Sequence, residues 1–451
     1  MTNIITRRSI TRRGVLAAGA GLAAMSAGAH KAFAQAGRVQ AANVTPPNLP
    51  IESGATLRML RPVRFVQPDE DVFRANAAKF TAKTGVQVRV DFVGWEDINQ
   101  QTAVTANTGA GPDLIMGFSD APHIFGSKLI DLTDVAEYVG KRYGGWLAMA
   151  EKYGKKSGSN DWLGLPFGAS GGPLVFRKSA VNAAGFQTVP DDHAGFLDLC
   201  KKLKAAGKPS GFALGNAVGD GNSFCNWLIW SFGGYLVDEG GKVAINSKET
   251  IDALNYLKEL YQTFIPGTTA WNDISNNRAY ASQELWLTAN GVSLYFALKN
   301  DPATAAIAED TQHQLMPKGR LNLSAMTGLT LNAMVFKHSK FPNASKAFLQ
   351  FMLEHEQHEP WLNANLGYWA HPLAAYDAAA VWQGDPRVSI FRDTMRSPFW
   401  NGYKGPITEA SGQANAEYVT VQMCAAVASG QSTAQEAVQE AERRARRIFR
   451  S

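Results

Sequence analysis

Hydrophobic and polar positions follow clear periods in the first part of the chain. Between residues 86 and 92, four apolar side chains alternate with polar ones, as in a strand with one buried face: Val86, Val88, Val90 and Phe92. Residues 71–84 carry apolar side chains at helical spacing, and a glycine follows where a helix would end. Short apolar runs at 57–60 and 113–116 predict buried strands, and another helix is expected from residue 97. This alternation predicts an α/β layer with right-handed crossovers.

A second α/β pattern follows after residue 166. It predicts strands at 174–176 and 212–214 and helices at 192–206 and 248–264. Near the C-terminus, Thr433 and Glu436 have the spacing of a capping box, and an apolar stripe follows them, which predicts a final helix. The chain therefore contains two α/β lobes, which suits a length of 451 residues.

The N-terminus has the features of an export signal. Arg12 and Arg13 precede a mildly hydrophobic run from residue 14 to 29, and Ala32-Phe33-Ala34 forms a small-x-small cleavage site. This order predicts a twin-arginine signal peptide over residues 1–34, with cleavage near Ala34 and a periplasmic product. Mitochondrial transit peptides and disordered tails with similar composition are the alternatives.

Removing the signal changes the electrostatic character of the protein. The formal net charge is +5, and residues 1–34 hold five basic and no acidic side chains: Arg7, Arg8, Arg12, Arg13 and Lys31. The mature chain is therefore close to neutral and has no long basic run. Such a chain has no evident electrostatic surface for nucleic acid or for an anionic membrane, so neither partner is expected.

The remaining composition is that of a soluble two-domain protein. The most apolar internal stretch, 224–237, is too short to span a membrane, so no stable membrane insertion is expected. Three cysteines, an odd number, imply no disulfide framework. No cysteine follows Ala34, so no lipid anchor is expected. Residues 35–54 contain three prolines and little apolar periodicity, which predicts a flexible leader.

A series of short motifs, in order over nearly all of residues 55–450, resembles the extracellular solute-binding proteins of ABC importers. The family in question is the carbohydrate type, which includes maltose-binding and glycerol-phosphate-binding proteins. The motifs are Phe80 to Val88 with Thr84-Gly85, Gly111-Pro112-Asp113-Leu114, Gly164-Leu165-Pro166, Leu174 to Lys178, Gly233-Gly234-Tyr235, Asn290-Gly291, Pro342 to Phe351 and Val427 to Ala437. Phe176 and Arg177 depart from the Tyr and Asn usual in the fourth motif.

The resemblance implies a type II periplasmic-binding fold with two lobes, a hinge and a ligand cleft between them. Lobe 1 is expected to comprise 55–166 and 328–368, and lobe 2 to comprise 167–327 and 369–451. Crossings are expected near 165–172, 324–328 and 368–372. The resemblance also implies a monomeric receptor without catalysis or cofactor, which captures a sugar or oligosaccharide, closes around it and docks on membrane permease subunits.

Candidate ligand residues in lobe 1 lie in loops that follow strands, where open α/β sheets collect ligands. They are Phe65, Trp95, Glu96, Ser119 and Asp120. The carboxylate of Asp120 can accept two hydroxyl hydrogen bonds, and similar sugar binders place an acidic residue here. The alternative for Asp120 is a helix cap.

Lobe 2 and the hinge supply further candidates, most of them aromatic. They are Asn226, Trp227, Trp271, Tyr295, Thr327, Tyr368, Trp369 and Trp400. Aromatic rings stack on the C–H faces of sugars, whereas hydroxyls need fixed polar partners. Trp227 belongs to a helical stripe that is more typical of a core. Arg61, Arg64 and Arg278 keep open a glycerol phosphate or another small anion as ligand.

Two enzyme-like motifs need separate interpretation. Gly168-Ala-Ser170-Gly-Gly172 satisfies G-x-S-x-G, so a secreted serine hydrolase that uses Ser170 is the rival hypothesis. A strand rather than a helix is predicted after it, which favours a glycine-rich hinge. His355 and His358 are three residues apart, not four as in zinc peptidases, and are expected at a solvated helix end. No metal site and no catalytic residue is therefore predicted.

Overall fold

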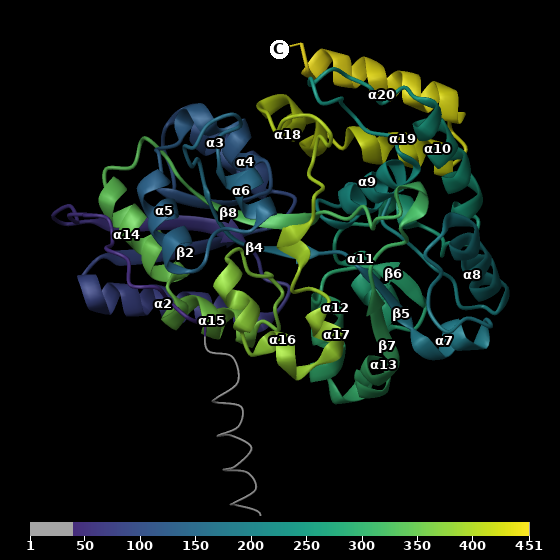
Figure 1. Cartoon of the computed structure of the whole chain (residues 1–451), viewed down its shortest axis with the longest axis horizontal. Coiled ribbons are helices and arrows are strands. Elements are labelled where there is room, and N and C mark those ends of the chain that lie inside the picture. Colours follow the sequence, from purple (N-terminus) through teal and green to yellow (C-terminus); the bar gives the residue numbers. More distant parts are fainter. Residues whose placement is uncertain (1–38, 451) are drawn as a thin grey trace, which may run out of the picture.

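The computed structural model describes residues 39–450 and shows two lobes lying side by side (Figure 1). The predicted signal peptide and its cleavage site lie outside the described residues. Within residues 39–450, no helix is both long enough and apolar enough to cross a membrane.

Lobe 1 is built on a five-stranded sheet with the order β2-β1-β3-β8-β4. β1 pairs in parallel with β2 and β3, and β8 runs antiparallel to both of its neighbours. The strands are β1 (Thr56–Pro62), β2 (Gln87–Val93), β3 (Leu114–Phe118), β4 (Leu165–Gly171) and β8 (Gly328–Val335). The first three match the strands that the apolar pattern predicts. β3 and β8 are buried along their whole length, as expected for central strands.

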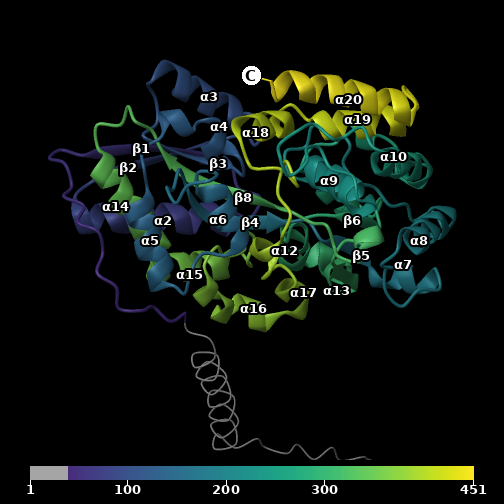
Figure 2. The same cartoon turned by 45° about the horizontal axis from the view of Figure 1, so that its top comes forward.

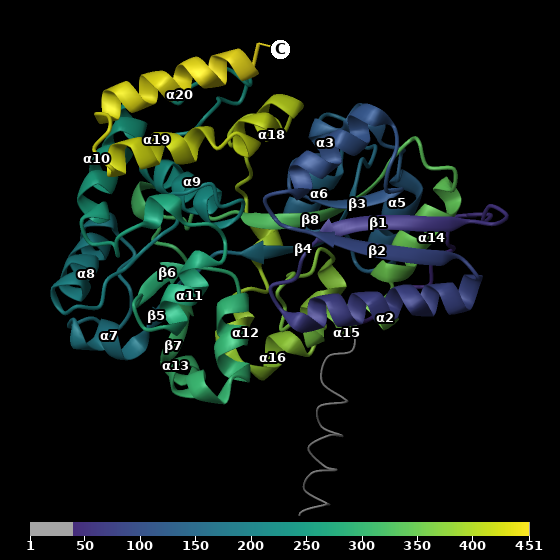
Figure 3. The same cartoon turned by 180° about the vertical axis from the view of Figure 1, so that it is seen from behind.

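Helices cover both faces of this sheet, with α3 and α6 on one side and α2 and α15 on the other (Figure 3). The predicted helix before Gly85 is α2, and Gly85 ends it in the left-handed conformation with φ +80°. The helices of lobe 1 are α2 (Gln67–Thr84), α3 (Ile98–Thr108), α4 (Ala121–Ile124), α5 (Thr133–Arg142), α6 (Ala148–Gly154), α14 (Pro342–Leu353) and α15 (His355–Ala364).

Lobe 2 holds a small antiparallel sheet, β6-β5-β7, surrounded by helices. Its strands are β5 (Leu174–Arg177), β6 (Leu287–Ala289) and β7 (Thr311–Gln314). Its helices are α7 (Lys178–Ala183), α8 (His193–Ala205), α9 (Asp220–Phe232), α10 (Lys248–Tyr261), α11 (Ser275–Ala281), α12 (Ser293–Asn300) and α13 (Ala305–Asp310), followed by α18 (Glu409–Ala416), α19 (Val419–Ala428) and α20 (Ala434–Ile448).

The predicted helix starts are confirmed at two caps. The Asp192 side chain accepts a hydrogen bond from the Gly195 amide at the start of α8, and Thr433 and Glu436 form the capping box of α20. The predicted strand at 212–214 is wrong. This segment is buried but joins no sheet, because its amides bond to separate loops: Leu214 N donates to Thr268 O, for example.

Three segments connect the lobes. The chain leaves the large sheet after Gly171 to form β5, and it returns from β7 to begin β8 at Gly328. Both glycines face Thr394: a Cβ on Gly171 would lie 2.5 Å from its Oγ1, and a Cβ on Gly328 would lie 2.6 Å from its Cγ2. Close packing of the three crossing segments therefore requires glycine at both positions.

The third segment runs along the boundary over residues 368–398 and touches both lobes. It includes the short helices α16 (Val381–Gly384) and α17 (Pro386–Ser389). The Tyr376 ring lies 5.5 Å from Tyr143 of lobe 1, whereas Asp385 accepts a 2.6 Å hydrogen bond from the Tyr295 hydroxyl of lobe 2. The expected division of the chain at residue 368 stays a prediction.

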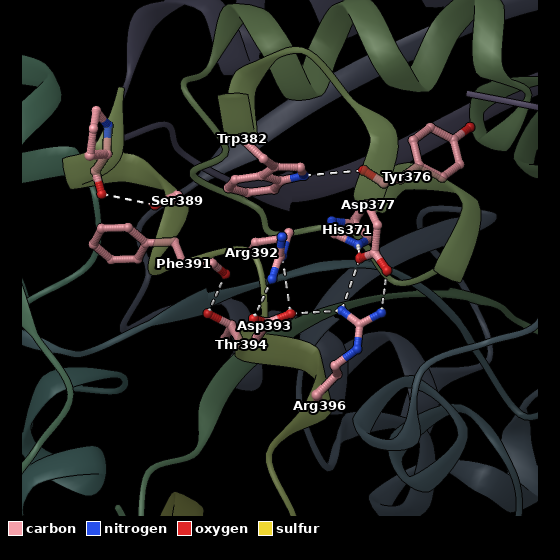
Figure 4. Close-up of polar contacts among 11 residues, drawn as sticks. His371, Tyr376, Asp377, Trp382, Ser389, Phe391, Arg392, Asp393, Thr394 and Arg396 are labelled. Atoms are coloured by element: carbon pink, nitrogen blue, oxygen red, sulfur yellow. Dashed lines mark hydrogen bonds and ion pairs between the residues drawn. The ribbon is translucent and has the colours of Figure 1, made fainter. Parts of the chain in front are cut away.

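A chain of ion pairs stiffens this third segment (Figure 4). Asp377 accepts from Arg396 at 2.6 and 2.9 Å and lies 2.9 Å from His371 Nε2. Arg396 also contacts Asp393 at 2.9 Å, and Asp393 contacts Arg392. These pairs lower the pKa of Asp377 to about 2, with the His371 hydrogen bond as the largest cause.

The described part of the predicted leader packs against lobe 1. Val39 is buried in its core, and three further apolar residues pack against it: Ala41, Val44 and Leu49. The Ala42 amide donates to Arg142 O, and Arg142 Nη1 donates back to Ala42 O. Residues 39–54 contain no helix or strand but make more contact with the fold than a flexible leader would.

Helices α18, α19 and α20 form a row along one edge of lobe 2, and α18 reaches across to α4 of lobe 1 (Figure 2). Gly412 of α18 makes this approach possible, since a Cβ there would lie 2.8 Å from Asp120 Cβ. The lobes therefore contact each other at a second place besides the three crossings.

Candidate functional site

A small cavity lies between the lobes, directly beside the crossing strands. Its volume is about 30 Å³, whereas sites for small molecules usually enclose ~300–1,000 Å³, so the lobes must part to admit a ligand. Residues from both lobes line it: Phe65, Trp95, Ser170, Gly171, Gly172, Gly219, Asp220, Ser223, Asp273, Asn290, Gly291 and Leu329. Sequence reasoning had selected only Phe65 and Trp95 from this set as ligand residues.

Lobe 1 contributes an aromatic wall. Phe65 follows β1 and packs edge-on against Trp95, with ring centroids 4.6 Å apart. Trp95 is fixed by a 2.8 Å hydrogen bond from its Nε1 to Val63 O and is stacked on Trp369 at 6.0 Å. Tyr368 lies 6.2 Å from Phe65 and 3.6 Å from the position of a Cβ on Gly291. Four predicted residues therefore cluster at the cavity, with Trp369 behind the other three.

Lobe 2 contributes two carboxylates. Asp273 accepts hydrogen bonds from the amides of Val218, Gly219 and Asp220 at 2.7, 2.9 and 2.8 Å, so it fixes the start of α9. Asp220 is the first residue of α9, and its Oδ2 accepts from Asn276 Nδ2 at 2.7 Å. Among the described residues, no side chain or amide donates to Asp220 Oδ1.

A network of amides supports Asp220 from below. Asn290 Nδ2 donates to Asn276 Oδ1 at 3.0 Å and also contacts Asn277 Oδ1. Asn276 Nδ2 donates to Ala289 O as well as to Asp220. Both amides are buried, and the network holds the carboxylate in one orientation toward the cavity.

Burial and like charge shift both carboxyl groups toward the neutral form. Burial raises the pKa of Asp220 well above its ordinary range, and the neighbouring Asp273 raises it further. Burial also raises the pKa of Asp273, against the effect of its three amide donors, and Glu96 adds to the increase. Glu96 is exposed and does not line the cavity, but its charge acts on Asp273, which does.

Ser119 and Asp120 lie elsewhere on the lobe boundary, at the end of β3. Ser119 is buried, and its amide and Oγ bond to the backbone of Thr330 across the sheet. Asp120 is 4% exposed and accepts a 2.6 Å hydrogen bond from Asn401 Nδ2, while its Oδ1 has no partner within residues 39–450. It makes no side-chain cap on α4.

Asp120 predicts a measurable pH dependence of stability. Burial raises its pKa from 3.8 to about 7, so the folded protein holds this proton more tightly than the unfolded chain does. Stability should therefore fall as the pH rises from 5 to 8, by ~2–3 kcal/mol from this group. In Asp120→Asn this loss should be absent, whereas the exposed Asp161→Asn should behave as the wild type. Urea unfolding at pH 5 and pH 8 measures the loss of stability. An equal loss in Asp120→Asn would show that Asp120 does not cause it.

The other predicted ligand residues lie away from the cavity. Trp227 is in the core of lobe 2, 1% exposed, and its Nε1 donates to Pro317 O at 2.9 Å. Tyr295 is held by Asp385, and Trp400 donates to Gly405 O and lies under Lys152. None of these three aromatics is among the described residues that line the cavity, and their role as ligand residues stays a prediction.

Three candidates lie near functional segments without lining the cavity. Asn226 is half-buried on α9, and Thr327 is buried just before β8. Trp271 is two residues from Asp273, and its ring faces Gly211, where a Cβ would lie 2.9 Å from it. Asp273, in the same loop, lines the cavity and Trp271 does not, so a ligand contact at Trp271 stays a prediction.

The arginines considered for an anionic ligand lie outside the cavity. Arg61 is fully buried and paired with Asp69 at 2.7 Å. Arg64 is paired with Glu70 at 2.5 Å, and Arg278 is exposed on α11. No lysine or arginine is among the described residues that line the cavity, so it offers no charged donor to a phosphate.

Ser170 lies in the cavity wall but not in a nucleophile elbow. It belongs to β4 and pairs with Leu329 of β8, and a second strand, β5, follows. A sharp turn from strand to helix is therefore absent at Ser170. No histidine is among the residues, within 39–450, that line the same cavity.

The histidine motif at the start of α15 differs from its expected exposure. His358 is buried, 1% exposed, and burial lowers its pKa to about 3, so the expectation of a solvated helix end is wrong for this residue. Glu354, His355 and Glu356 bring ligand atoms within 4.8 Å of one another. However, Glu354 already accepts from Arg142 at 2.8 Å and from two tyrosine hydroxyls.

A larger hollow of about 760 Å³ lies on the outer surface of lobe 1. It is a groove between the leader, α2 and α14, lined among others by Pro47, Phe80 and Phe351. It receives residues from only one lobe. A change in lobe closure cannot act on it, so it is not the functional site that the fold suggests.

The chain matches known solute-binding proteins over most of its length. Residues 75–389 match the family of bacterial extracellular solute-binding proteins. A putative ABC transporter periplasmic-binding protein of Escherichia coli, YcjN, is 22% identical over 308 residues, which cover 66% of this chain and 69% of that protein. The protein therefore belongs to the bacterial extracellular solute-binding protein family, as the sequence motifs predicted.

Solved structures confirm the two-lobed fold. Maltose-bound MalE3 of T. maritima has a TM-score of 0.72 at 19% identity, and the match covers 88% of this chain and 100% of that one. A sugar transporter of Arthrobacter chlorophenolicus with bound laminaribiose scores 0.76 at 17% identity, covering 88% and 99%. A solute-binding protein of Agrobacterium vitis with bound D-mannitol scores 0.71 at 16% identity, covering 88% and 99%.

Proposed function

We propose that this protein captures a carbohydrate or polyol in its interlobe cleft and delivers it to the permease subunits of an ABC importer. The observation that carries the proposal is the pairing of an aromatic wall, Phe65 and Trp95, with the carboxylate of Asp220 across the cleft. Aromatic rings stack on C–H faces, and carboxylate and amide oxygens accept hydrogen bonds from hydroxyl groups. A sugar offers both C–H faces and hydroxyl groups. The structurally similar proteins that contain maltose, laminaribiose or D-mannitol support the same ligand class.

Conformational change is the proposed means of signalling. Ligand contacts residues from both lobes, so it has a higher affinity for the closed state and shifts the population toward it. The closed, ligand-bound monomer then docks on the permease. We propose that the protein reaches the periplasm by the twin-arginine route, with its signal removed near Ala34, and that it neither catalyses a reaction nor carries a cofactor.

A thermal-shift screen of the mature protein tests the ligand class. A ligand at 100 times its Kd should stabilise the fold by ~2.7 kcal/mol and raise the Tm measurably. We expect sugars or polyols to do so and organic phosphates not to. Phe65→Ala should reduce the shift, whereas Phe186→Ala, the same truncation on the outer surface of lobe 2, should preserve it.

Two results would contradict the proposal. Stabilisation by organic phosphates, with none by any sugar or polyol, would assign the cleft to anions. Esterase turnover that is lost in Ser170→Ala would show that the strand serine is a nucleophile and that the protein is an enzyme.

A further inference from the structure

The interlobe cleft gathers acidic groups, and no lysine or arginine is among the described residues that line its cavity. Asp220 and Asp273 line the cavity, and Glu96 lies close enough to raise the pKa of Asp273. The two arginines nearest to Phe65 in sequence are already paired, Arg61 of β1 with Asp69 and Arg64 with Glu70. Lobe closure therefore brings no protein counterion to these groups, so the closed cleft favours their neutral form, and a cation placed beside them would favour the ionised form.

The two carboxylates differ in their remaining hydrogen-bonding capacity. Asp273 uses both oxygens on three backbone amides, so it is part of the framework. Asp220 uses only Oδ2, on Asn276, and its Oδ1 is left for the cavity. Asp120, at another point of the lobe boundary, has a buried oxygen without a partner in the described chain. Within the lining of the cavity, Asp220 Oδ1 is therefore an acceptor left for a ligand.

The aromatic wall adds a second feature that suits a positive charge. Trp95 approaches α9 closely, since a Cβ on Gly219 would lie 3.9 Å from its Cζ3, and Gly219 is the neighbour of Asp220. Phe65 packs on the same indole. A group placed between these rings and Asp220 would meet the faces or edges of aromatic rings on one side and a carboxylate on the other. An ammonium group gains from both, through cation–π attraction and a charge-assisted hydrogen bond.

We propose that the ligand carries a protonated amine, as in an amino sugar or an aminated polyol, and that Asp220 is the residue that selects it. This inference rests on the proposed function, because it specifies the charge of the carbohydrate that the cleft takes. A hydroxyl group can occupy the same position and donate one hydrogen bond, but it does not favour the ionised form of Asp220. An ammonium group does, because it supplies the counterion that the cavity lining lacks.

Titration calorimetry with matched ligands tests the inference. D-glucosamine is compared with D-glucose, and 1-amino-1-deoxy-D-glucitol with D-glucitol, at pH 7 and low salt. The amine of each pair should bind at least ~10-fold more tightly, the usual gain of a charge-assisted over a neutral hydrogen bond. Asp220→Asn keeps the shape of the side chain and an acceptor for Asn276, and it should remove this preference. Asp198→Asn, the same charge change on the exposed face of α8, should keep it.

The outcomes separate this inference from the proposed function. Tighter binding of the amines, lost in Asp220→Asn and kept in Asp198→Asn, supports the inference. Equal or tighter binding of the neutral sugars, or an amine preference that survives in Asp220→Asn, overturns it and leaves carbohydrate capture intact. If neither member of either pair binds while organic phosphates do, the proposed function fails as well. Circular dichroism of both variants shows whether each is folded.

Discussion

Asp69→Ala is expected to lower the free energy of unfolding by ~3–5 kcal/mol, because it leaves a buried guanidinium without a counterion. Arg61 is fully buried, and its Nη2 donates to both carboxylate oxygens of Asp69 at 2.7 Å. Its Nε and Nη1 have no acceptor within the described chain and lie near the Phe73 ring, 4.5 Å from the guanidinium carbon. Among residues 39–450, this carboxylate is therefore the one anion paired with the buried guanidinium.

The loss should exceed that of one ion pair because Asp69 also orients the aromatic layer behind the cleft. Trp361 Nε1 donates to its Oδ1 at 3.0 Å, and Trp369 Nε1 donates to its Oδ2 at 3.2 Å. Trp369 in turn stacks on Trp95, a wall of the interlobe cavity. Without Asp69, two buried indole donors lose a charged acceptor, which costs more than the loss of a neutral one.

Glu70→Ala is the matched control, since Glu70 is the next residue in the same turn of α2. It pairs with Arg64 and Arg74, whose side chains are 40% and 49% exposed, so its removal should cost less than ~1 kcal/mol. Urea unfolding of the mature protein, followed by tryptophan fluorescence, compares the two variants. Equal destabilisation by both would mean that the buried pair is no more important than a surface pair.

The fold was largely predictable from the sequence because its elements carry strong periods and end signals. The alternation at Val86 to Phe92 and the helical spacing before Gly85 both correspond to observed elements, β2 and α2. The segment 212–214 was mispredicted because a short apolar run shows only that a segment is buried. Whether its amides join a sheet depends on partners far away in the sequence, here Thr268 for Leu214.

The residues of the cleft were less predictable than the fold. They come together only through contacts between segments that are far apart in the sequence. The position of Phe65 and Trp95 at the lobe boundary was predictable because each follows a strand of one sheet, and such strand ends meet at one edge. Asp220 and Asp273 are 53 residues apart, and neither stands in a pattern that sets it apart from ordinary loop acids. Their roles arise from the backbone of residues 218–220, which folds onto Asp273 and turns Asp220 toward lobe 1. Trp227, by contrast, has a helical neighbourhood that already indicated a core position.

Gly219→Leu is expected to weaken ligand binding by ~100-fold while leaving each lobe folded. Gly219 has φ −89°, which leucine adopts without strain, and its amide can still donate to Asp273. A Cβ at this position would lie 3.1 Å from Asp273 Oδ1, 3.4 Å from Leu329 Cδ2 and 3.9 Å from Trp95 Cζ3. The last two atoms belong to lobe 1, so a longer side chain fills the cavity and separates the lobes.

The expected loss follows from the closed state, in which ligand and leucine would compete for one space. Overpacking costs ~1–3 kcal/mol. If this strain occurs only when the lobes close, it lowers the affinity for ligand by about 10- to 100-fold. The leucine side chain also occupies space that the ligand needs. Small-angle scattering should show a larger radius of gyration for the variant than for the wild type, independently of any ligand. Gly384→Leu is the control, because no atom lies within 4 Å of a Cβ there. Unchanged affinity and unchanged dimensions in Gly219→Leu would show that closure does not bring α9 against the aromatic wall.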